Sequence, residues 1–345
     1  MDYKEVEVFE GGIVLKGVKH FHPQQIFECG QCFRWTSRNT KKDHYLGIVE
    51  GKVLEVKLVQ DEVYLLGITL DEFQVFFRDY FDLPRNYSKI KGALRKDPLL
   101  KKAVSFGFGI RILRQDPFET IISFILSSNN LIPKIREGIR RISEKYGQSI
   151  QYEGETYYAF PTPEALSRAT EEELRGLGLG YRAAYIEKTA KLVYEASLLK
   201  IEKEKRALTP EERESLSYDL TYISDLPEEE CLKALMRFPG VGMKVADCIM
   251  LFSMGKTGAF PVDVWVKKAM VYFYGAEPGS LPKMRSFAKE KFGDLAGFSQ
   301  QYLFYYAREK KIRIPEEKRE KKIEEETPKD SAAGKQRILQ GLFLF

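Results

Sequence analysis

The first 80 residues alternate short apolar runs with turn residues. These runs cover 12–15, 45–49, 52–56 and 63–66. Each run is only four or five residues long, which suits a strand better than a helix. Glu50 and Gly51 separate two of the runs, and a two-residue link of this kind is typical of a tight β-hairpin. This part of the chain therefore predicts an antiparallel sheet with one or two helices.

From about residue 85 onward the apolar positions recur with a helical period. Asp116, Pro117 and Glu119 form a typical helix start, with an acid at the N-cap, a proline in the first turn and a glutamate three residues after the cap. Further helices are predicted at 134–146, 163–176, 181–200, 227–238, 243–254, 264–274, 282–292 and 297–310. The chain is therefore expected to be an α+β protein with its sheet at the N-terminal end.

The pattern divides the chain into three parts: an antiparallel sheet domain over 1–90, a helical domain over 91–310, and a C-terminal segment over 311–345. Twelve of the sixteen residues at 315–330 are charged, so this stretch buries too little to fold alone. It is either a solvated linker or a short charged helix. The chain then ends on an apolar stretch.

Composition adds two limits. No apolar run approaches the ~20 residues that a membrane helix needs, and the N-terminus has no basic segment followed by an apolar one, so we expect an intracellular protein. The net charge of +5 permits a nucleic-acid partner without establishing one. Basic residues gather at 88–114 and 134–145, where phosphate contacts and solvated helix faces are both open interpretations.

The four cysteines favour no metal or redox site. Cys29 and Cys32 form a C-x-x-C pair, but a redox dithiol needs a βαβ context and a zinc site needs a second ligand pair. Cys231 and Cys248 are seventeen residues apart, and the spacing of an iron–sulfur cluster is missing. We therefore expect no metal and no cofactor, with a dithiol oxidoreductase kept as an alternative.

The most informative stretch is 231–265. Two helical patterns are joined by Phe-Pro-Gly-Val-Gly at 238–242, which predicts a helix-hairpin-helix over 228–254. Gly240 and Gly242 permit a tight hairpin and leave backbone N–H groups free at the start of the second helix, where the helix dipole also attracts a phosphate. An ordinary tight corner between two helices is the alternative.

Two residues near this hairpin could carry chemistry. Lys244 lies in the first turn of the second helix, where the positive helix end and any burial would lower the pKa of its amine. A neutral amine can attack C1′ of a deoxyribose and form a Schiff base. Asp263 precedes another helix, so it is either an N-cap or a carboxylate that stabilises positive charge developing on the sugar.

The run Pro-Gly-Val-Gly-x-Lys-Val-Ala-Asp-Cys, followed by Pro-Val-Asp-Val, resembles the 8-oxoguanine DNA glycosylase family of the helix-hairpin-helix superfamily. The resemblance implies a small antiparallel sheet domain followed by two helical subdomains, with the flipped base bound between them. It also implies a bifunctional enzyme that excises 8-oxoguanine from double-stranded DNA through Lys244, assisted by Asp263, and then cleaves the strand by β-elimination.

Two further segments imply the base contacts. Gly30 opens a Gly-Gln-Cys-Phe-Arg-Trp segment that resembles the one whose glycine carbonyl accepts a hydrogen bond from N7–H of 8-oxoguanine, a donor that guanine lacks. The late helix near 296–304 implies Gln300 at the base edge and Phe304 on the base face, with Cys248 on the opposite face. Ordinary core packing is the alternative for Phe304 and Cys248.

The resemblance also implies DNA contacts. Asn129, in Ser-Ser-Asn-Asn, would fill the gap left by the flipped nucleotide, Tyr181 would wedge the base stack, and Arg182 would reach the opposite cytosine. Lys134 stands where the family usually has an arginine, so the resemblance does not imply recognition of the opposite cytosine by two arginines. Trp265 replaces the usual histidine, so the phosphate contact at that position must change.

Two other functions stay open: a non-catalytic helix-hairpin-helix DNA-binding module, and a sibling glycosylase with a different base preference. The last six residues, from Gln340 to Phe345, resemble the Gln-x-x-apolar-x-Phe peptides that dock bacterial repair proteins on the sliding clamp. The alternative is that this apolar end packs back on its own domain. We expect a monomer that does not bind membranes, located in the cytoplasm and, in a bacterium, associated with the nucleoid.

Overall fold

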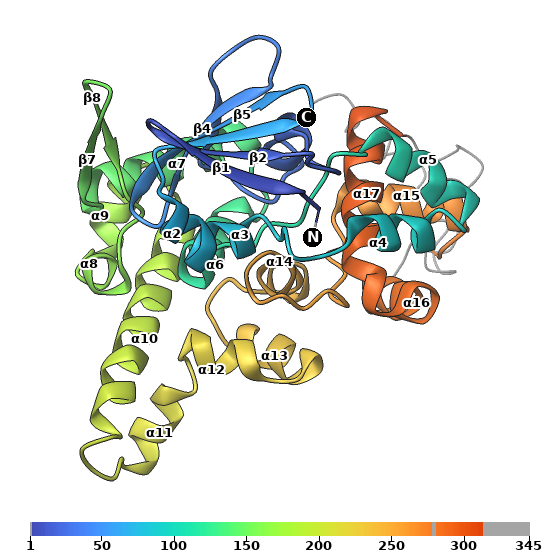
Figure 1. Ribbon diagram of the computed structural model, residues 1–345. Helices are drawn as coiled ribbons and strands as arrows, with labels where there is room; N and C mark the ends of the chain where they lie inside the picture. Colours follow the sequence, from blue (N-terminus) through green and yellow to red (C-terminus); the bar gives the residue numbers. More distant parts are fainter. Residues whose placement is uncertain (1, 278–280, 313–345) are drawn as a thin grey trace, which may run out of the picture.

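The computed structural model describes residues 2–277 and 281–312. Its N-terminal part is a six-stranded antiparallel sheet with the strand order β1-β2-β6-β5-β4-β3 (Figure 1). The strands are β1 (Glu5–Phe9), β2 (Gly12–Lys16), β3 (Trp35–Ser37), β4 (His44–Val49), β5 (Lys52–Val59) and β6 (Glu62–Leu66). The antiparallel sheet predicted from the alternating runs is confirmed. The sequence missed β1 and β3, because β1 is largely exposed and charged and β3 has only three residues.

The predicted hairpin between β4 and β5 is also confirmed. Glu50 and Gly51 have φ values of 50° and 69°, and two successive positive φ angles are what a type I′ turn requires. The turn sets the register Val49↔Lys52. This register places Val53, Leu54 and Val56 in the interior of the domain.

Short helices complete the sheet domain: α1 (Pro23–Phe27), α2 (Leu70–Glu72), a π-helical turn (Phe73–Phe77) and α3 (Arg78–Tyr80). Trp35 stacks on Phe27 with ring centroids 3.9 Å apart, which joins the sheet to α1. The apolar cluster of the sheet domain includes Leu83 and also Leu113, whereas Tyr87 already belongs to the helical cluster. The two parts thus interlock near the predicted boundary at residue 90, which stays a prediction.

The remaining helices form the larger part of the molecule. They are α4 (Tyr87–Leu94), α5 (Pro98–Phe106), α6 (Pro117–Ser127), α7 (Ile132–Tyr146), α8 (Pro163–Ser167), α9 (Glu171–Gly176), α10 (Arg182–Glu202), α11 (Pro210–Leu216), α12 (Leu220–Asp225), α13 (Glu228–Leu235), α14 (Met243–Ser253), α15 (Val264–Tyr274), α16 (Leu281–Phe292) and α17 (Ala296–Glu309). In Figure 1, α14 lies near the centre, with α4, α5 and α15 to α17 to its right, α6 to α12 to its left or lower left, and α13 below it.

The predicted helices did not include α4, α5, α11 and α12, and two further details of the sequence prediction are wrong. The helix predicted at 163–176 is two helices, because Thr170 starts α9 with a capping box that includes Glu173. A two-stranded hairpin, β7 (Ser149–Tyr152) and β8 (Glu155–Tyr158), was not predicted because both strands are half-exposed and largely polar.

Two cations of the basic segment 88–114 are structural, so the suggested phosphate contacts are wrong for them. Arg111 is fully buried, pairs with Asp2 at 2.9 Å and donates to the Phe81 carbonyl. Lys91 is also buried and donates to the Phe108 carbonyl. Burial lowers the pKa of Lys91 to about 7.

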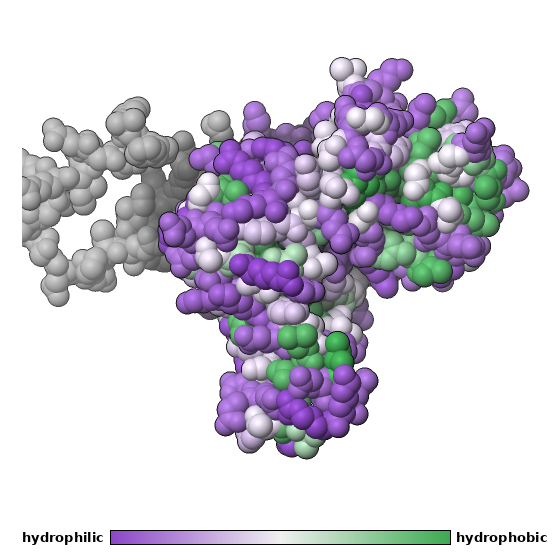
Figure 2. All heavy atoms as spheres, turned by 90° about the vertical axis from the view of Figure 1, so that its left-hand side faces the viewer, coloured by the Kyte–Doolittle hydropathy of each residue, from purple (hydrophilic) through white to green (hydrophobic). Residues whose placement is uncertain are grey.

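The face of the molecule drawn in Figure 2 is mostly hydrophilic, with apolar side chains gathered in patches that include the lower projection of α10 and α11. Leu198 and Ile201 of α10 are among the exposed apolar residues. Within the described ranges, no helix has both the length and the apolar character needed to cross a bilayer.

Candidate active site and DNA-binding surface

A pocket of about 210 Å³ opens where the loop 29–33 meets α6, α7, α14, α15 and α17. Seven of the residues that the sequence singled out line it: Gly30, Lys244, Cys248, Asp263, Trp265, Gln300 and Phe304. These residues come from four segments that are far apart in the chain. The fold therefore brings the expected catalytic and base-binding residues into one cavity.

Lys244 is the second residue of α14, which begins directly after the hairpin. Its Nζ lies 3.5 Å from Ser127 Oγ and 5.3 Å from the ring centroid of Phe124. Ser127 and Phe124 both belong to α6, which packs against α14. The amine thus extends over an aromatic wall into the pocket, beside a single hydroxyl group that it contacts.

The structure is compatible with both roles that the sequence left open for Asp263. It is the N-cap of α15, because its Oδ1 accepts a hydrogen bond from the Val266 N–H at 2.8 Å. It also lines the pocket with Lys244. Burial raises the pKa of the Asp263 carboxyl, while the Val266 N–H and the positive charge of Lys244 oppose this rise. An acceptor held by the helix start and directed at the pocket can stabilise a neighbouring positive charge.

Gly30 lies directly against Phe304 and needs to be glycine for two reasons. Its φ is +83°, and a β-carbon at this position would lie 2.9 Å from Cε1 of Phe304. Arg308, one turn further along α17, stacks its guanidinium 5.1 Å from the Phe304 ring centroid and donates to the Glu28 carbonyl at 2.6 Å. Arg308 also lines the pocket, and the sequence gave no local signal for it.

Gln31 holds the Gly30 loop in place, a role that the sequence did not reveal. Its side chain is fully buried. It donates to the carbonyls of Ile26 and Arg111 at 2.9 and 2.8 Å, and its Oε1 accepts from the Leu113 N–H at 2.9 Å. Two of these bonds join the loop to residues 111–113, about 80 positions further along the chain, so only the tertiary structure identifies the role.

Gln300 and Gln301 are neighbours on α17 with different surroundings. Gln301 donates from Nε2 to the Cys29 carbonyl at 2.7 Å and so fixes the same loop. Gln300 is 4% exposed, lines the pocket and has no hydrogen-bond partner for its Oε1. A buried amide oxygen without a partner is costly, so a ligand that donates to it would be favoured.

The cysteines behave as buried thiols. Burial raises the pKa of Cys248 to about 12, opposed by the positive charge of Lys244, so this thiol is protonated at neutral pH. Cys29 and Cys32 are buried and free, and burial raises the pKa of Cys29 to about 11. This geometry does not support the dithiol oxidoreductase alternative, which needs an accessible thiolate. Residues 2–277 and 281–312 contain no group of three or more metal-ligating side chains.

Three expected DNA contacts lie together outside the pocket. Asn129 has a φ of 49°, a left-handed conformation that asparagine tolerates. Arg182 donates to the Ser128 carbonyl at 3.0 Å and to the Asn129 carbonyl at 2.9 Å, and it stacks 4.5 Å from the Tyr181 ring centroid. Tyr181 is 48% exposed, so its ring is available for stacking. Lys134 lies exposed in the first turn of α7.

The two hairpin glycines differ in their surroundings, and only Gly240 has to be glycine. Gly240 has a φ of +77°, and a β-carbon there would lie 2.5 Å from the Tyr185 ring of α10. Gly242 is the N-cap of α14, and the space around its Cα is open. Open backbone at a helix start suits a phosphate. Trp265 lines the pocket, and the Nζ of Lys268 is 4.5 Å from its ring centroid.

The chain matches two family models in succession. Residues 13–121 match the N-terminal domain of 8-oxoguanine DNA glycosylase, and residues 122–293 match the HhH-GPD superfamily of base excision DNA repair proteins. Among curated proteins, it is 38% identical over 225 residues to the N-glycosylase/DNA lyase of Saccharomyces cerevisiae, spanning 57% of this chain and 56% of that one. It is 29% identical over 258 residues to a probable N-glycosylase/DNA lyase of Methanothermobacter thermautotrophicus, spanning 69% and 74%.

Solved structures extend the likeness over nearly the whole molecule. The chain superposes on the Clostridium acetobutylicum 8-oxoguanine glycosylase/lyase, solved with double-stranded DNA containing cytosine opposite 8-oxoguanine, with a TM-score of 0.82. The two are 46% identical, and the match covers 90% of this chain and all of the other. The α+β architecture, the sheet domain and the helix-hairpin-helix thus agree with the fold of known members. This chain belongs to the 8-oxoguanine DNA glycosylase family.

Proposed function

We propose that this protein excises 8-oxoguanine from double-stranded DNA and cleaves the strand at the resulting site. One observation carries the proposal: Lys244 and Asp263 share a pocket with Gln300, whose buried amide oxygen has no partner. The names of the relatives support it, since the Clostridium protein is an 8-oxoguanine glycosylase/lyase and the yeast protein is an N-glycosylase/DNA lyase.

Recognition of the base follows from the walls of the pocket. The target nucleotide leaves the base stack, as enzymes that act on duplex bases require, and its purine enters beside Phe304. The Oε1 of Gln300 accepts hydrogen bonds from the N–H groups on one edge of the base. The Gly30 carbonyl accepts from N7–H, a group that 8-oxoguanine has and guanine lacks. Cys248, a neutral thiol, lies on another wall of the same pocket.

The chemistry follows from Lys244. Its neutral amine nitrogen forms a bond to C1′ while the bond from C1′ to N9 breaks, and the departing base takes that electron pair and one proton from the attacking nitrogen. Opening of the sugar ring gives a Schiff base. Removal of a C2′ proton then expels the 3′-phosphate by β-elimination, which cleaves the strand. The carboxylate of Asp263 stabilises the positive charge that develops on the sugar.

The DNA contacts are part of the same proposal. The N–H groups around Gly240 and Gly242 bind a phosphate of the damaged strand. Tyr181 and Asn129 fill the space that the flipped nucleotide leaves, and Arg182 reaches the opposite base. Lys134 adds a positive charge near that base, and Trp265 contacts the DNA backbone through its ring and indole N–H.

Borohydride trapping tests the proposal directly, because reduction of a Schiff base cross-links the enzyme to DNA. The wild-type protein is expected to cross-link to an 8-oxoguanine duplex and not to an undamaged one. Lys244→Gln is expected to bind the duplex, to release no base and to form no cross-link. Lys191→Gln, which removes an exposed lysine paired with Glu187, is the matched control and should trap normally.

Trapping by Lys244→Gln would show that another residue is the nucleophile. Binding without trapping or base release by the wild-type protein would instead support the non-catalytic DNA-binding module. Measuring excision against a panel of other damaged bases addresses the sibling-glycosylase alternative, because the Gly30 contact requires a donor at N7.

We also propose that the stretch from Gln340 to Phe345, which lies outside the described residues, docks on a sliding clamp. The support is its sequence pattern alone. Deleting 336–345 should abolish clamp binding and leave the melting temperature and the activity on short duplexes unchanged. A clear fall in melting temperature, with no clamp binding by the intact protein, would show that the segment packs on its own domain. The monomeric state and the nucleoid location stay predictions.

A further inference from the structure

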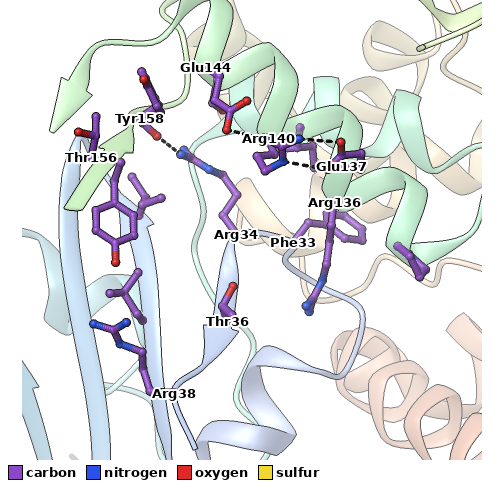
Figure 3. Close-up of a pocket in the computed structure, with 16 residues that line it drawn as sticks. Phe33, Arg34, Thr36, Arg38, Arg136, Glu137, Arg140, Glu144, Thr156 and Tyr158 are labelled. Atoms are coloured by element: carbon purple, nitrogen blue, oxygen red, sulfur yellow. Dashed lines mark hydrogen bonds and ion pairs between the residues drawn. The ribbon is translucent and has the colours of Figure 1, made fainter. Parts of the chain in front are cut away.

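A second cavity lies beside the candidate active site, between the sheet and α7. Its volume is about 490 Å³, more than twice that of the pocket that holds Lys244. β3, β4 and the 33–34 segment form one wall, α7 forms another, and β8 forms a third (Figure 3). None of the catalytic or base-binding residues described above lines it.

Two polar groups on α7 reach this cavity without a partner. Ser143 is 3% exposed, lines the cavity and has no hydrogen bond to its Oγ. Arg136 also lines the cavity, and its buried Nε has no hydrogen bond either. Ser143 is seven positions after Arg136, which is about two helical turns, so the two lie on the same face of the helix, about 10 Å apart along its axis. Buried polar groups are normally paired, so two unpaired groups that face one cavity favour binding of a ligand with polar atoms there.

The charges around the cavity leave Arg136 uncompensated. Arg140 pairs with Glu137 at 2.7 Å and also with Glu144, and Arg141 is a second partner of Glu137, so both acids of α7 that line the cavity already have arginine partners. Two other arginines of the lining have carboxylate partners as well: Arg34 with Glu119, and Arg38 with Glu55 and Glu153. Arg136 forms no ion pair with any described residue, and Figure 3 shows its guanidinium extending away from Glu137 and Arg140.

The space between the two unpaired groups is lined by apolar side chains. Ile139 lies between Arg136 and Ser143 on α7, and Leu46 and Ile48 of β4 face it across the cavity. An apolar wall of this kind suits a flat ring. We propose that this cavity binds an anionic, ring-bearing ligand of the size of a nucleoside monophosphate, with its phosphate on Arg136 and its ring edge hydrogen-bonded to Ser143.

An occupant of this cavity would touch the wall of the active site. Phe33 lines both cavities. Its ring packs edge-on against Phe124 at 5.6 Å between centroids, and Phe124 lies 5.3 Å from the Nζ of Lys244. The segment that carries Phe33 also carries Gly30. A ligand beside Phe33 therefore contacts the element that positions the base-binding glycine.

Isothermal titration calorimetry on the full-length protein without DNA tests the inference. The probes are dGMP, deoxyguanosine and inorganic phosphate, which separate the phosphate from the ring. We expect saturable binding of dGMP, with deoxyguanosine and inorganic phosphate each bound at least about tenfold more weakly, the range of one charge-assisted hydrogen bond. Arg136→Gln and Ser143→Ala should weaken dGMP binding, the former by at least about tenfold.

Two controls locate the site. Arg168→Gln, which removes an exposed arginine paired with Glu164, should bind dGMP as the wild type does. Gln300→Ala should also retain binding, because Gln300 lines the other pocket. Loss of binding in Gln300→Ala with retention in Arg136→Gln would place the nucleotide in the active site and overturn the inference. Absence of saturable binding at millimolar dGMP would overturn it as well. Neither result depends on the excision activity proposed above.

Discussion

The phenyl ring of Phe304 packs against the Cα of Gly30, closely enough that a β-carbon on residue 30 would lie 2.9 Å from Cε1 of the ring. Gly30 also has a φ of +83°, which strains any residue with a side chain. The contact therefore fixes the position of the Phe304 ring and of the Gly30 backbone together. Both are surfaces that we propose the flipped base touches, so a shift of either one changes the wall that the base meets.

Gly30→Ala is expected to lower kcat/KM for excision of 8-oxoguanine by at least about tenfold, because Phe304 must move or the loop must shift by a few tenths of an ångström. Single-turnover excision rates measure the effect on catalysis, and melting temperatures measure the effect on stability. Gly92→Ala is the matched control, since Gly92 lies in α4 with open space around its Cα. Wild-type excision by Gly30→Ala would show that the base does not bind against this contact.

Asp263→Asn separates the two roles of that residue. Asparagine caps a helix about as well as aspartate, so the melting temperature should change little. The single-turnover excision rate should fall by about 100-fold or more, because the charge that stabilises the developing sugar cation is lost. Since burial raises the pKa of Asp263, the wild-type rate should also decline on acidification at a pH above the 3.8 of an ordinary aspartate. An unchanged rate in Asp263→Asn would reduce Asp263 to a cap.

Much of the fold could be predicted from the sequence because its strongest signals are local. The strands at 12–66 alternate or cluster apolar residues, and α6 begins with a full set of capping residues at Asp116 to Glu119. The hairpin β7–β8 could not be predicted, because its half-exposed polar strands carry no clear period. The break between α8 and α9 depends on the capping box at Thr170, a local signal that the apolar period conceals.

The site shows the same division between local and non-local information. Lys244 and Asp263 were found because each stands beside a recognisable helix start. Gln31 and Arg308 were missed, because they act through the Leu113 N–H and the Glu28 carbonyl, 82 and 280 residues away in the chain. Hydrogen bonds between such distant segments leave no pattern in a single sequence, so residues that position a catalytic loop become visible only in three dimensions.

Asp247, one turn after Lys244, gives a prediction for stability against pH. Its side chain is 2% exposed and lies 3.1 Å from Arg285, yet burial raises its pKa from 3.8 to about 6, with Arg285 opposing the rise. Between these two pKa values the folded state binds more protons at Asp247 than the unfolded state does. Protonation of Asp247 therefore stabilises the fold at low pH, and this stabilisation is lost as the pH rises from about 4 to about 6.

Asp247→Asn removes the titration and keeps an acceptor for Arg285. Relative to the wild type, the free energy of unfolding of the variant should therefore rise between pH 4.5 and pH 7, by about 1–2 kcal/mol, and stay level from pH 7 to pH 8.5. Urea unfolding at the three pH values measures the difference. A difference that does not change between pH 4.5 and pH 7 would show that the Asp247 carboxyl does not titrate in this window.

Discrimination of the base opposite 8-oxoguanine should rest mainly on Arg182. Its guanidinium is already held by the Ser128 and Asn129 carbonyls and stacked on Tyr181, so it is preorganised, whereas Lys134 is an exposed point charge that cannot form a planar fork. We therefore expect excision opposite adenine to approach the rate opposite cytosine within about tenfold.

Lys134→Arg should widen this ratio in favour of cytosine, and Arg182→Ala should abolish what preference remains. Excision rates with each of the four opposite bases measure these ratios, with Arg175→Ala as a control on an exposed arginine paired with Glu171. Strict cytosine preference in the wild type that Arg182→Ala alone removes would show that one arginine suffices and that Lys134 plays no part.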